Sequence, residues 1–316
     1  MEDQSLELPK IIDAHCHIAS EELTPRSFIY GAIDNMVSAL WAQGLRGAAA
    51  SKLANLYCQK MQDPLCDALV AEMAESGVSK SILLAADFTY ALKDCALSIE
   101  ESFSRHRDVL ARHPGKFEVF GGVDPRWGND GLTLFERSLK EFGFRGFKVY
   151  PPCGFSPSFE GLFPFYELCA QYKAPVVVHI GPTSPALAFD KSNPFLIDEA
   201  ARNFPTVDFI MAHSSVSFTE ESVMMCAFRP NVYLDISGYQ SSFRTDGTGG
   251  AVRRVVSRGI NHKVLFGTDW PVFRLQGDQH SFVEAVISED GPLSDLSETE
   301  KSLILQGNAE RLLGSA

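Results

Sequence analysis

The stretch that decides the fold reads Lys-Ile-Ile-Asp-Ala-His-Cys-His and covers residues 10–17. Its apolar start is typical of a buried β-strand. Alternate side chains of a strand share a face, so Asp13, His15 and His17 should point the same way. Neutral imidazole is a common ligand of zinc, and a catalytic zinc site needs three protein ligands and an open position. The stretch therefore predicts part of a metal site at a strand end, the alternative being two polar residues there by chance.

Three further apolar runs end in residues of metal-ligand type, which are His179, His213 and Asp269. A fourth run, residues 145–151, carries Lys148 near its end. These are the side chains of a hydrolase with one or two metals. The remaining histidines of the chain lie in helical or loop stretches: His106, His113, His262 and His280.

The composition indicates one large catalytic domain that spans residues 1–316. Hydrophobic residues make up 45% of the chain, enough for a sizeable core, and no Pro/Gly/Ser-rich linker divides it. No apolar run is long enough to cross a membrane, and the acidic start does not resemble a signal peptide, so we expect a cytoplasmic protein without a membrane partner. The net charge of -12 and the lack of basic runs argue against nucleic acid as a partner. We expect a small-molecule substrate.

The seven cysteines include no C-x-x-C pair, which argues against a disulfide framework. Cys16 lies between the two histidines of the first strand, so strand alternation turns it toward an outer helical layer as a small buried residue. Cys153 follows the fourth predicted strand. No histidine adjoins it in sequence, so a structural thiol is favoured over a nucleophile.

Eight apolar runs suit buried parallel strands, which lack polar alternation because both of their faces are covered. Amphipathic helical stretches, such as residues 132–142 and 164–172, separate these runs. Repeated alternation of strand and helix favours a (β/α)8 barrel, the TIM-barrel fold of the α/β class, over an open sheet. Active sites of such barrels lie at the carboxyl ends of the strands, where all the candidate ligands stand. The runs begin near Lys10, Lys80, Phe117, Arg145, Pro175, Asp208, Val232 and Val264.

One connection is too long for an ordinary βα loop. Residues 19–73 precede the second predicted strand and contain the helical periodicity of Ile33, Met36, Val37 and Leu40. We expect a helical insertion that packs over the barrel mouth as a lid. The alternative is a structural insertion or the interface of a homo-oligomer.

The chain resembles the metal-dependent amidohydrolase superfamily, in the branch that includes aminocarboxymuconate-semialdehyde decarboxylase. The resemblance covers nearly the whole chain. It rests on the first-strand motif from Asp13 to His17, on His179 and His213, and on Phe-Gly-Thr-Asp-Trp-Pro at residues 266–271. The terminal residues 307–314 match as well and should form a helix with its cap rather than a site.

The resemblance implies that His15, His17, His179 and Asp269 bind one divalent metal, and that this metal is zinc. Metal-activated water loses a proton near neutral pH, and an ionised aspartate beside it can accept that proton, so Asp269 would be both ligand and general base. His213 would bind a second metal or polarise the substrate; in the decarboxylase relatives the matching histidine is an acid or base. The structural alternatives are a helix cap for Asp269 and a core histidine for His213.

The chemical state of Lys148 distinguishes a two-metal site from a one-metal site. Two-metal members of the superfamily have a carboxylated lysine on strand four that bridges the metals, and residues 147–151 resemble that segment in dihydroorotase. A free ammonium would instead repel a metal and bind a substrate carboxylate. A purely structural role is the third alternative.

The substrate is less well specified. Arg126 follows the third predicted strand and is either a carboxylate ligand or a surface arginine at a turn. Tyr150 and Trp270 would contact a planar substrate in an aromatic mouth completed by Phe155 and Tyr239, or else pack in the core.

We expect a hydrolase that uses metal-activated water on a small amide, lactone or related carbonyl compound. The alternative is a non-hydrolytic, metal-dependent decarboxylase of a small unsaturated or aromatic carboxylate. A barrel with a purely structural metal is disfavoured, because structural zinc sites are closed and do not lie at a barrel mouth.

Overall fold

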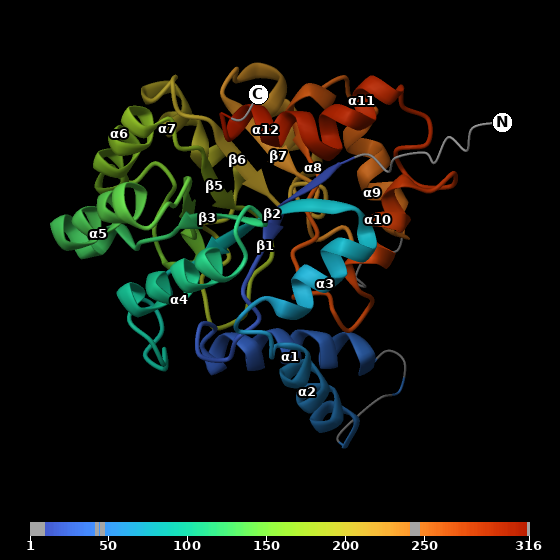
Figure 1. Ribbon diagram of the computed structural model, residues 1–316, viewed down its shortest axis with the longest axis horizontal. Helices are drawn as coiled ribbons and strands as arrows, with labels where there is room; N and C mark the ends of the chain where they lie inside the picture. The colour runs from blue at the N-terminus through green and yellow to red at the C-terminus, as the bar shows by residue number, and fades with distance from the viewer. Residues whose placement is uncertain (1–9, 42–43, 45–47, 241–246, 315–316) are drawn as a thin grey trace.

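Eight parallel strands form the centre of the molecule in the computed structural model, which describes residues 10–41, 44, 48–240 and 247–314 (Figure 1). Each strand pairs with the next along the chain, and each begins within two residues of its predicted start. The strands are β1 (Ile11–Cys16), β2 (Val78–Ala85), β3 (Phe117–Gly121), β4 (Gly146–Val149), β5 (Val176–His179), β6 (Phe209–Ala212), β7 (Val232–Asp235) and β8 (Val264–Leu265).

The sheet closes between its first strand and the residues that follow its last one. The N–H of Ala14 donates to the carbonyl of Phe266 at 2.9 Å, and the N–H of His17 donates to the carbonyl of Trp270 at 2.7 Å. Asp269 is tied in the same way, because its N–H donates to the carbonyl of His15 at 2.8 Å. The predicted (β/α)8 barrel is therefore confirmed, and its closure brings Asp269 beside β1.

Helices surround the barrel (Figure 1). The two amphipathic helices predicted at residues 132–142 and 164–172 are α5 and α6. The helices of the ring and its connections are α3 (Asp67–Ser76), α4 (Ile99–Arg112), α5 (Gly128–Glu141), α6 (Phe163–Tyr172), α7 (Asp198–Asn203), α8 (Thr219–Phe228), α9 (Gly247–Val256), α10 (Gln279–Ile287), α11 (Glu298–Ser302) and α12 (Asn308–Leu312). In the described part of the chain, no helix is long and apolar enough to span a membrane.

The strands separate two apolar cores. The larger core lies between strands and helices and contains Cys16, as strand alternation predicted. The smaller core fills the barrel interior, where Ile12 and Ile210 meet Leu312 from the carboxyl-terminal helix. The terminal segment thus covers the amino-terminal end of the barrel, and the opposite end is left for the site.

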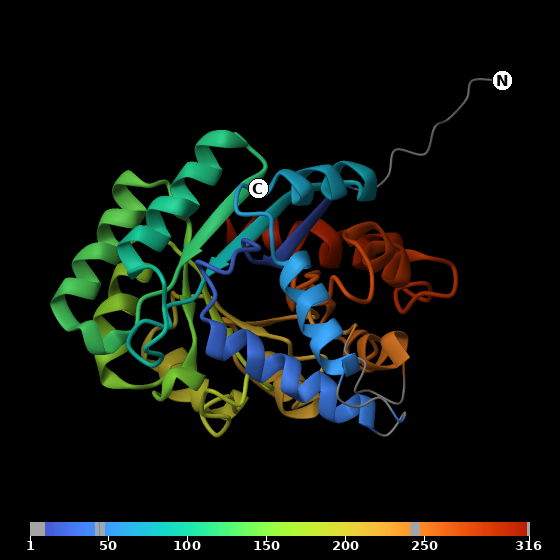
Figure 2. The same cartoon turned by 90° about the horizontal axis from the view of Figure 1, so that it is seen from below.

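Two helices cross that opposite end. They are α1 (Arg26–Trp41) and α2 (Ala48–Lys60), which lie apart from the ring in Figure 1 and pass across the barrel in Figure 2. Ile29 and Ile33 of α1 pack against Tyr57 of α2. The third helix of the predicted insertion, α3, packs against α10 and leads into β2, so we assign it to the ring. A lid role for α1 and α2 stays a prediction.

Candidate metal centre

The histidines of β1 reach the barrel mouth because the strand is irregular near its end. The register between β1 and β2 shifts after Asp13, and such a shift breaks the alternation of side chains. Asp13 accepts hydrogen bonds from Thr268 at 2.6 Å and from Gln279 of α10 at 2.9 Å. It therefore points into the helical layer, and the prediction that it shares a face with His15 and His17 is wrong.

His15, His17 and Asp269 form a compact group. Asp269 Oδ1 lies 3.3 Å from His17 Nε2 and 3.6 Å from His15 Nε2. His17 Nδ1 donates to the carbonyl of Leu84 at 2.8 Å, and His15 Nδ1 lies 2.8 Å from a carboxylate oxygen of Asp235. Since a neutral imidazole carries one proton, here on Nδ1, both Nε2 atoms present lone pairs to Asp269.

This group fits a divalent metal. Two imidazole lone pairs and a carboxylate oxygen repel one another unless a proton or a cation lies between them. Ligands about 2.1 Å from a tetrahedral zinc ion are about 3.4 Å apart, and the two separations here are 3.3 and 3.6 Å. His15 Nε2 is also buried without a hydrogen-bond partner in the described part of the chain. A bound metal would give this nitrogen the partner that buried polar atoms require.

Asp235 organises the group, although the sequence did not single it out. Besides the contact with His15, its carboxylate accepts the backbone N–H groups of His213 and Ser237, each at 3.0 Å. A carboxylate that accepts a hydrogen bond from the ring nitrogen not bound to the metal fixes the tautomer and the orientation of a metal-binding histidine. The signal was present in the sequence, because the apolar run that begins at Val232 ends in a carboxylate.

His179 lies at the same mouth, beside the compact group rather than within it. Its Nε2 donates to the carbonyl of Pro182 at 2.9 Å, so Nδ1 holds the lone pair. The centre of its ring is 4.4 Å from that of Tyr150 and 4.9 Å from that of His213. The predicted role of His179 as a metal ligand remains a proposal.

His213 follows β6 directly and has a φ of 60°. Asp269 has a φ of 57°, and such left-handed conformations of residues other than glycine are costly and cluster at functional sites. The hydroxyl of Ser237 donates to Asp235, so its oxygen accepts from Nδ1 of His213 at 2.9 Å. His213, His15 and Asp235 offer ligand atoms within 4.8 Å of one another, which defines a second group.

A cavity of about 900 Å³ leads to these residues. His17, His179, His213 and Asp269 lie on its wall, to which α1 contributes seven residues between Phe28 and Ala39 and α2 contributes Tyr57. This volume is within the range of about 300–1,000 Å³ that small-molecule sites occupy. Apolar side chains predominate on the wall, among them Leu23, Phe28, Ile29, Met36, Met61 and Phe88.

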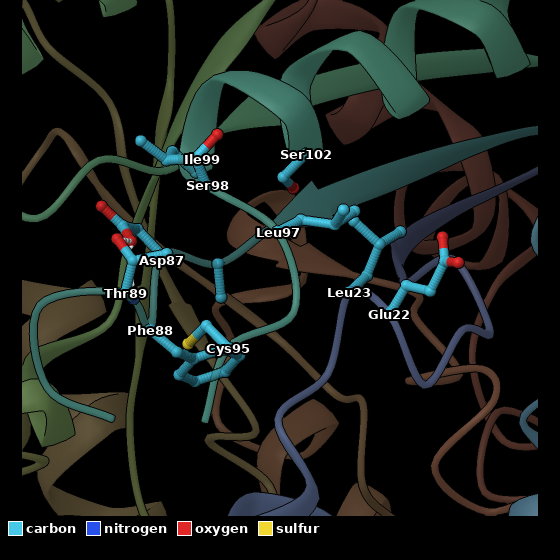
Figure 3. Close-up of a pocket in the computed structure, with 11 residues that line it drawn as sticks. Glu22, Leu23, Asp87, Phe88, Thr89, Cys95, Leu97, Ser98, Ile99 and Ser102 are labelled. Carbon is cyan, nitrogen blue, oxygen red and sulfur yellow. Dashed lines mark hydrogen bonds between the residues drawn. The ribbon is translucent and has the colours of Figure 1, made fainter. Parts of the chain in front are cut away.

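A second, much smaller cavity of about 20 Å³ adjoins this wall, and Figure 3 shows the residues that line it. It shares Leu23, Ala86, Phe88 and Ser102 with the large cavity and is completed by residues that include Asp87 and Cys95. A water molecule needs about 10–15 Å³ of such space. The small cavity can therefore hold a water but not a substrate.

Burial keeps three histidines of the site neutral. Together with the charge of Lys148, it lowers the pKa of His179 to about 3 and the pKa of His15 well below its ordinary value. Together with the neighbouring imidazoles of His15 and His179, it lowers the pKa of His213 well below its ordinary value. Neutral imidazoles are the form that binds metals. Burial raises the pKa of the Asp269 carboxyl, and the neighbouring His17 opposes that rise. A bound cation would, like His17, lower the pKa of this carboxyl.

Lys148 is enclosed among these residues. Its side chain is 1% exposed, and its Nζ has no hydrogen-bond partner in the described part of the chain. Burial lowers its pKa to about 8, against the attraction of Asp235 and Asp269. Because Lys148 is not on the cavity wall, its position does not support direct binding of a substrate carboxylate by its ammonium.

Arg126 and Trp270, which were predicted to bind substrate, also lie off the cavity wall. The guanidinium of Arg126 pairs with both oxygens of Asp124, at 2.8 and 2.5 Å, and donates to the carbonyl of Cys153 at 2.8 Å. Trp270 is buried, and its indole N–H donates to Glu72 at 3.0 Å. Both side chains are bound within the protein, in line with the structural alternatives, and a role of either in substrate binding stays a prediction.

Tyr150 is the one member of the predicted aromatic mouth on the described cavity wall. The rings of Phe28 and Phe88 lie beside it, with centres 6.4 and 5.1 Å from its own. Phe155 and Tyr239 are buried elsewhere, so the prediction that they form part of the mouth is wrong. The aromatic wall is therefore built largely by residues outside the strands.

A (β/α)8 barrel that gathers imidazoles and a carboxylate at the carboxyl ends of its strands defines a metal-dependent α/β-barrel enzyme. The amidohydrolase family matches residues 12–315, and the chain belongs to this family. The family resemblance seen in the sequence is thereby confirmed.

Solved structures share the fold over nearly the whole chain. An uncharacterized TIM-barrel protein from Bordetella bronchiseptica is 19% identical with a TM-score of 0.68, covering 97% of this chain and 99% of that one. A dihydroxybenzoic acid decarboxylase from a Polaromonas species is 18% identical with a TM-score of 0.65 and 97% coverage of both chains. The 2,6-dihydroxybenzoate decarboxylase from Rhizobium is 16% identical with a TM-score of 0.64, covering 97% and 99%.

A curated relative matches only a part of the chain. Protein fluG from Emericella nidulans is 28% identical over 103 residues, which make up 33% of this chain and 12% of that protein. The chain thus matches only a small part of the length of this relative, and the match carries nothing about the activity of the longer protein.

Proposed function

We propose that the protein is a metal-dependent, non-hydrolytic decarboxylase of an unsaturated or aromatic carboxylate. The observation that carries the proposal is the apolar cavity with His17, His179, His213 and Asp269 on its wall. Loss of carbon dioxide disperses the localised charge of a carboxylate, so a poorly hydrated site with fixed dipoles favours it. Hydrolysis instead requires a water beside the substrate, and the apolar wall offers that water few partners.

Known decarboxylases support this choice over the hydrolysis that we expected from the sequence. Several proteins that share the fold over nearly the whole chain act on dihydroxybenzoates or 5-carboxyvanillate. Membership of the amidohydrolase family does not by itself separate the two reactions, so hydrolysis of an amide or lactone becomes an outcome of the test.

We infer the roles of the residues from their positions at the metal centre and on the cavity wall. A divalent metal held by His15, His17, His179 and Asp269 would supply the positive charge that binds the substrate carboxylate. Tyr150 would support an aromatic ring, since its own ring lies on the cavity wall. The bond between the ring carbon and the carboxylate breaks, carbon dioxide leaves, and the carbon takes a proton. We assign to Asp269 the uptake of that proton from solvent and its delivery to the carbon, with His213 orienting the substrate.

We propose zinc as the metal because imidazole-rich sites suit it. Two of the similar decarboxylases hold manganese, so manganese is the alternative. Metal analysis of protein purified without chelators should find a divalent ion near one per chain, and His179→Ala should lose both metal and activity. A His179→Ala protein that keeps both would overturn the ligand assignment.

The reaction is tested by following two products separately. The metal-loaded protein is incubated with aryl carboxylates, lactones and amides, while released carbon dioxide and released acid are measured in parallel. A decarboxylase releases carbon dioxide and, in deuterium oxide, places one deuterium on the product carbon. Acid release without carbon dioxide would identify a hydrolase instead. The cytoplasmic location and a homo-oligomeric state stay predictions.

A further inference from the structure

One buried histidine outside the metal centre also faces the cavity. His106 lies in α4, is 3% exposed and is part of the cavity wall. Its Nδ1 is 2.8 Å from the carbonyl oxygen of Ser102, one helical turn earlier. A carbonyl only accepts hydrogen bonds, so Nδ1 carries the ring proton and Nε2 is left with a lone pair.

The lone pair on Nε2 has no hydrogen-bond partner among the described residues. Burial lowers the pKa of His106 to about 4, so the ring stays neutral and Nε2 acts only as an acceptor. Because His106 lies on the cavity wall, Nε2 can accept a hydrogen bond from whatever fills the cavity. A ligand that displaces cavity water without offering a donor would leave this acceptor buried and unpaired, which is unfavourable, whereas a ligand that donates a hydrogen bond would not.

The rest of the wall restricts the charge of that ligand. Among the described residues that line the cavity there is no lysine, arginine or glutamate, and Asp269 is the only aspartate. A second charge on the ligand would be buried without a counter-ion, which is strongly unfavourable. The wall therefore accepts one anionic group at the metal and an uncharged remainder.

We propose that His106 is a specificity-determining residue that accepts a hydrogen bond from a hydroxyl or N–H on the body of a monoanionic, largely apolar carboxylate. This inference rests on the proposed function, because the metal is taken to hold the carboxylate. The volume of about 900 Å³ lies near the upper end of the range for small-molecule sites, so it accommodates more than a single ring.

Binding to the metal-loaded protein tests the inference without any turnover. The probes are 2-naphthoic acid, its derivatives with a hydroxyl on the ring remote from the carboxylate, and a naphthalenedicarboxylic acid, all titrated by calorimetry. A remote hydroxyl avoids chelation of the metal beside the carboxylate. The variants are His106→Phe, which lacks an acceptor, and His106→Gln, which retains one. His280→Phe, an exposed site in α10, is the matched control.

We expect at least one hydroxylated probe to bind about tenfold or more tightly than naphthoic acid. His106→Phe should abolish this preference, while His106→Gln and His280→Phe should keep most of it. The dicarboxylic acid should bind at least about tenfold more weakly than the monoacid.

Four results would overturn the inference: no preference for any hydroxylated probe, a preference that survives in His106→Phe, tight binding of the dicarboxylic acid, or failure of every probe to bind. A finding that the enzyme hydrolyses its substrate would refute the proposed decarboxylation alone, because these titrations measure binding.

Discussion

His15 and Asp235 are joined by a contact of 2.8 Å between Nδ1 and Oδ2, and neither side chain is exposed to solvent. The pair links β1 to β7. Since the carboxylate holds the proton of His15 on Nδ1, the lone pair of Nε2 is fixed toward Asp269. Asp235 is thus a positioning residue for the metal centre rather than a group that touches the substrate.

Replacement of Asp235 should weaken metal binding more than folding. Asp235→Asn removes the negative charge that fixes the His15 tautomer, and we expect a loss of about 10- to 100-fold in metal affinity. Titration with zinc and manganese, followed by calorimetry, measures it. Ser237→Ala, which removes one smaller partner of the same network, should cost less. Equal metal affinity in wild type and Asp235→Asn would contradict the positioning role.

Much of this fold was predictable because both faces of a parallel strand are buried. The continuous apolar runs marked each strand start within two residues, and the positions of His179 and His213 at strand ends followed from those runs. The direction of Asp13 did not follow. It depends on a register shift between β1 and β2, which no local pattern in the sequence reveals.

The positions of side chains whose partners are distant in the sequence were harder to predict. Trp270 was predicted to lie at the barrel mouth, but its indole N–H donates a hydrogen bond to Glu72, which is 198 residues away in the sequence. Arg126 differs, because its partner Asp124 lies two residues away and could have been foreseen. His106 was set aside as a helical histidine, since nothing local shows that α4 faces a cavity wall.

Asp269 should be needed for turnover more than for folding. Asp269→Asn retains the shape of the side chain but cannot carry the proton, and we expect turnover to fall by at least about 100-fold. Circular dichroism and metal analysis of the same preparation check that the variant is folded and loaded. Near-normal turnover in a correctly loaded Asp269→Asn protein would exclude the proposed acid-base role.

The contact between α1 and the segment after β5 predicts how the insertion affects substrate binding. A Cβ at Gly31 would collide with the hydroxyl of Ser184, which donates to the carbonyl of Phe28 at 2.9 Å. Gly31→Val should therefore displace α1 and raise KM several-fold, with little change in metal content. Asp34→Val introduces the same side chain at an exposed position of the same helix. Equal KM values for the two variants would argue against a lid.

Lys148 should make the stability of the metal-free protein depend on pH. Its pKa is about 8 in the folded protein and 10.5 as the reference value, so the unfolded chain binds more protons between these values. Stability should therefore rise with pH from about 8 to 10.5, and the full cost of the buried charge, about 3 kcal/mol, should be present below pH 8.

Two substitutions test that account by denaturant unfolding. Lys148→Met should raise the free energy of unfolding at pH 7 and remove the rise at high pH, because it deletes a buried ammonium that has no hydrogen-bond partner among the described residues. Lys263 is the matched control, since its ammonium donates to the carbonyls of Cys226 and Arg229 at 2.7 and 2.6 Å. Lys263→Met should destabilise the protein. Destabilisation by both changes would show that Lys148 has a stabilising structural role.

The same lysine decides between one metal and two. A bare ammonium opposes a second cation at the group of His15, His213 and Asp235, whereas a carboxylated lysine carries a negative charge that two cations can share. We expect about one metal per chain, no response to bicarbonate during reconstitution, and retention of that metal in Lys148→Met. Elemental analysis after reconstitution with and without bicarbonate measures this. Two metals per chain that appear only with bicarbonate would instead establish a carboxylated Lys148 and strengthen hydrolysis over decarboxylation.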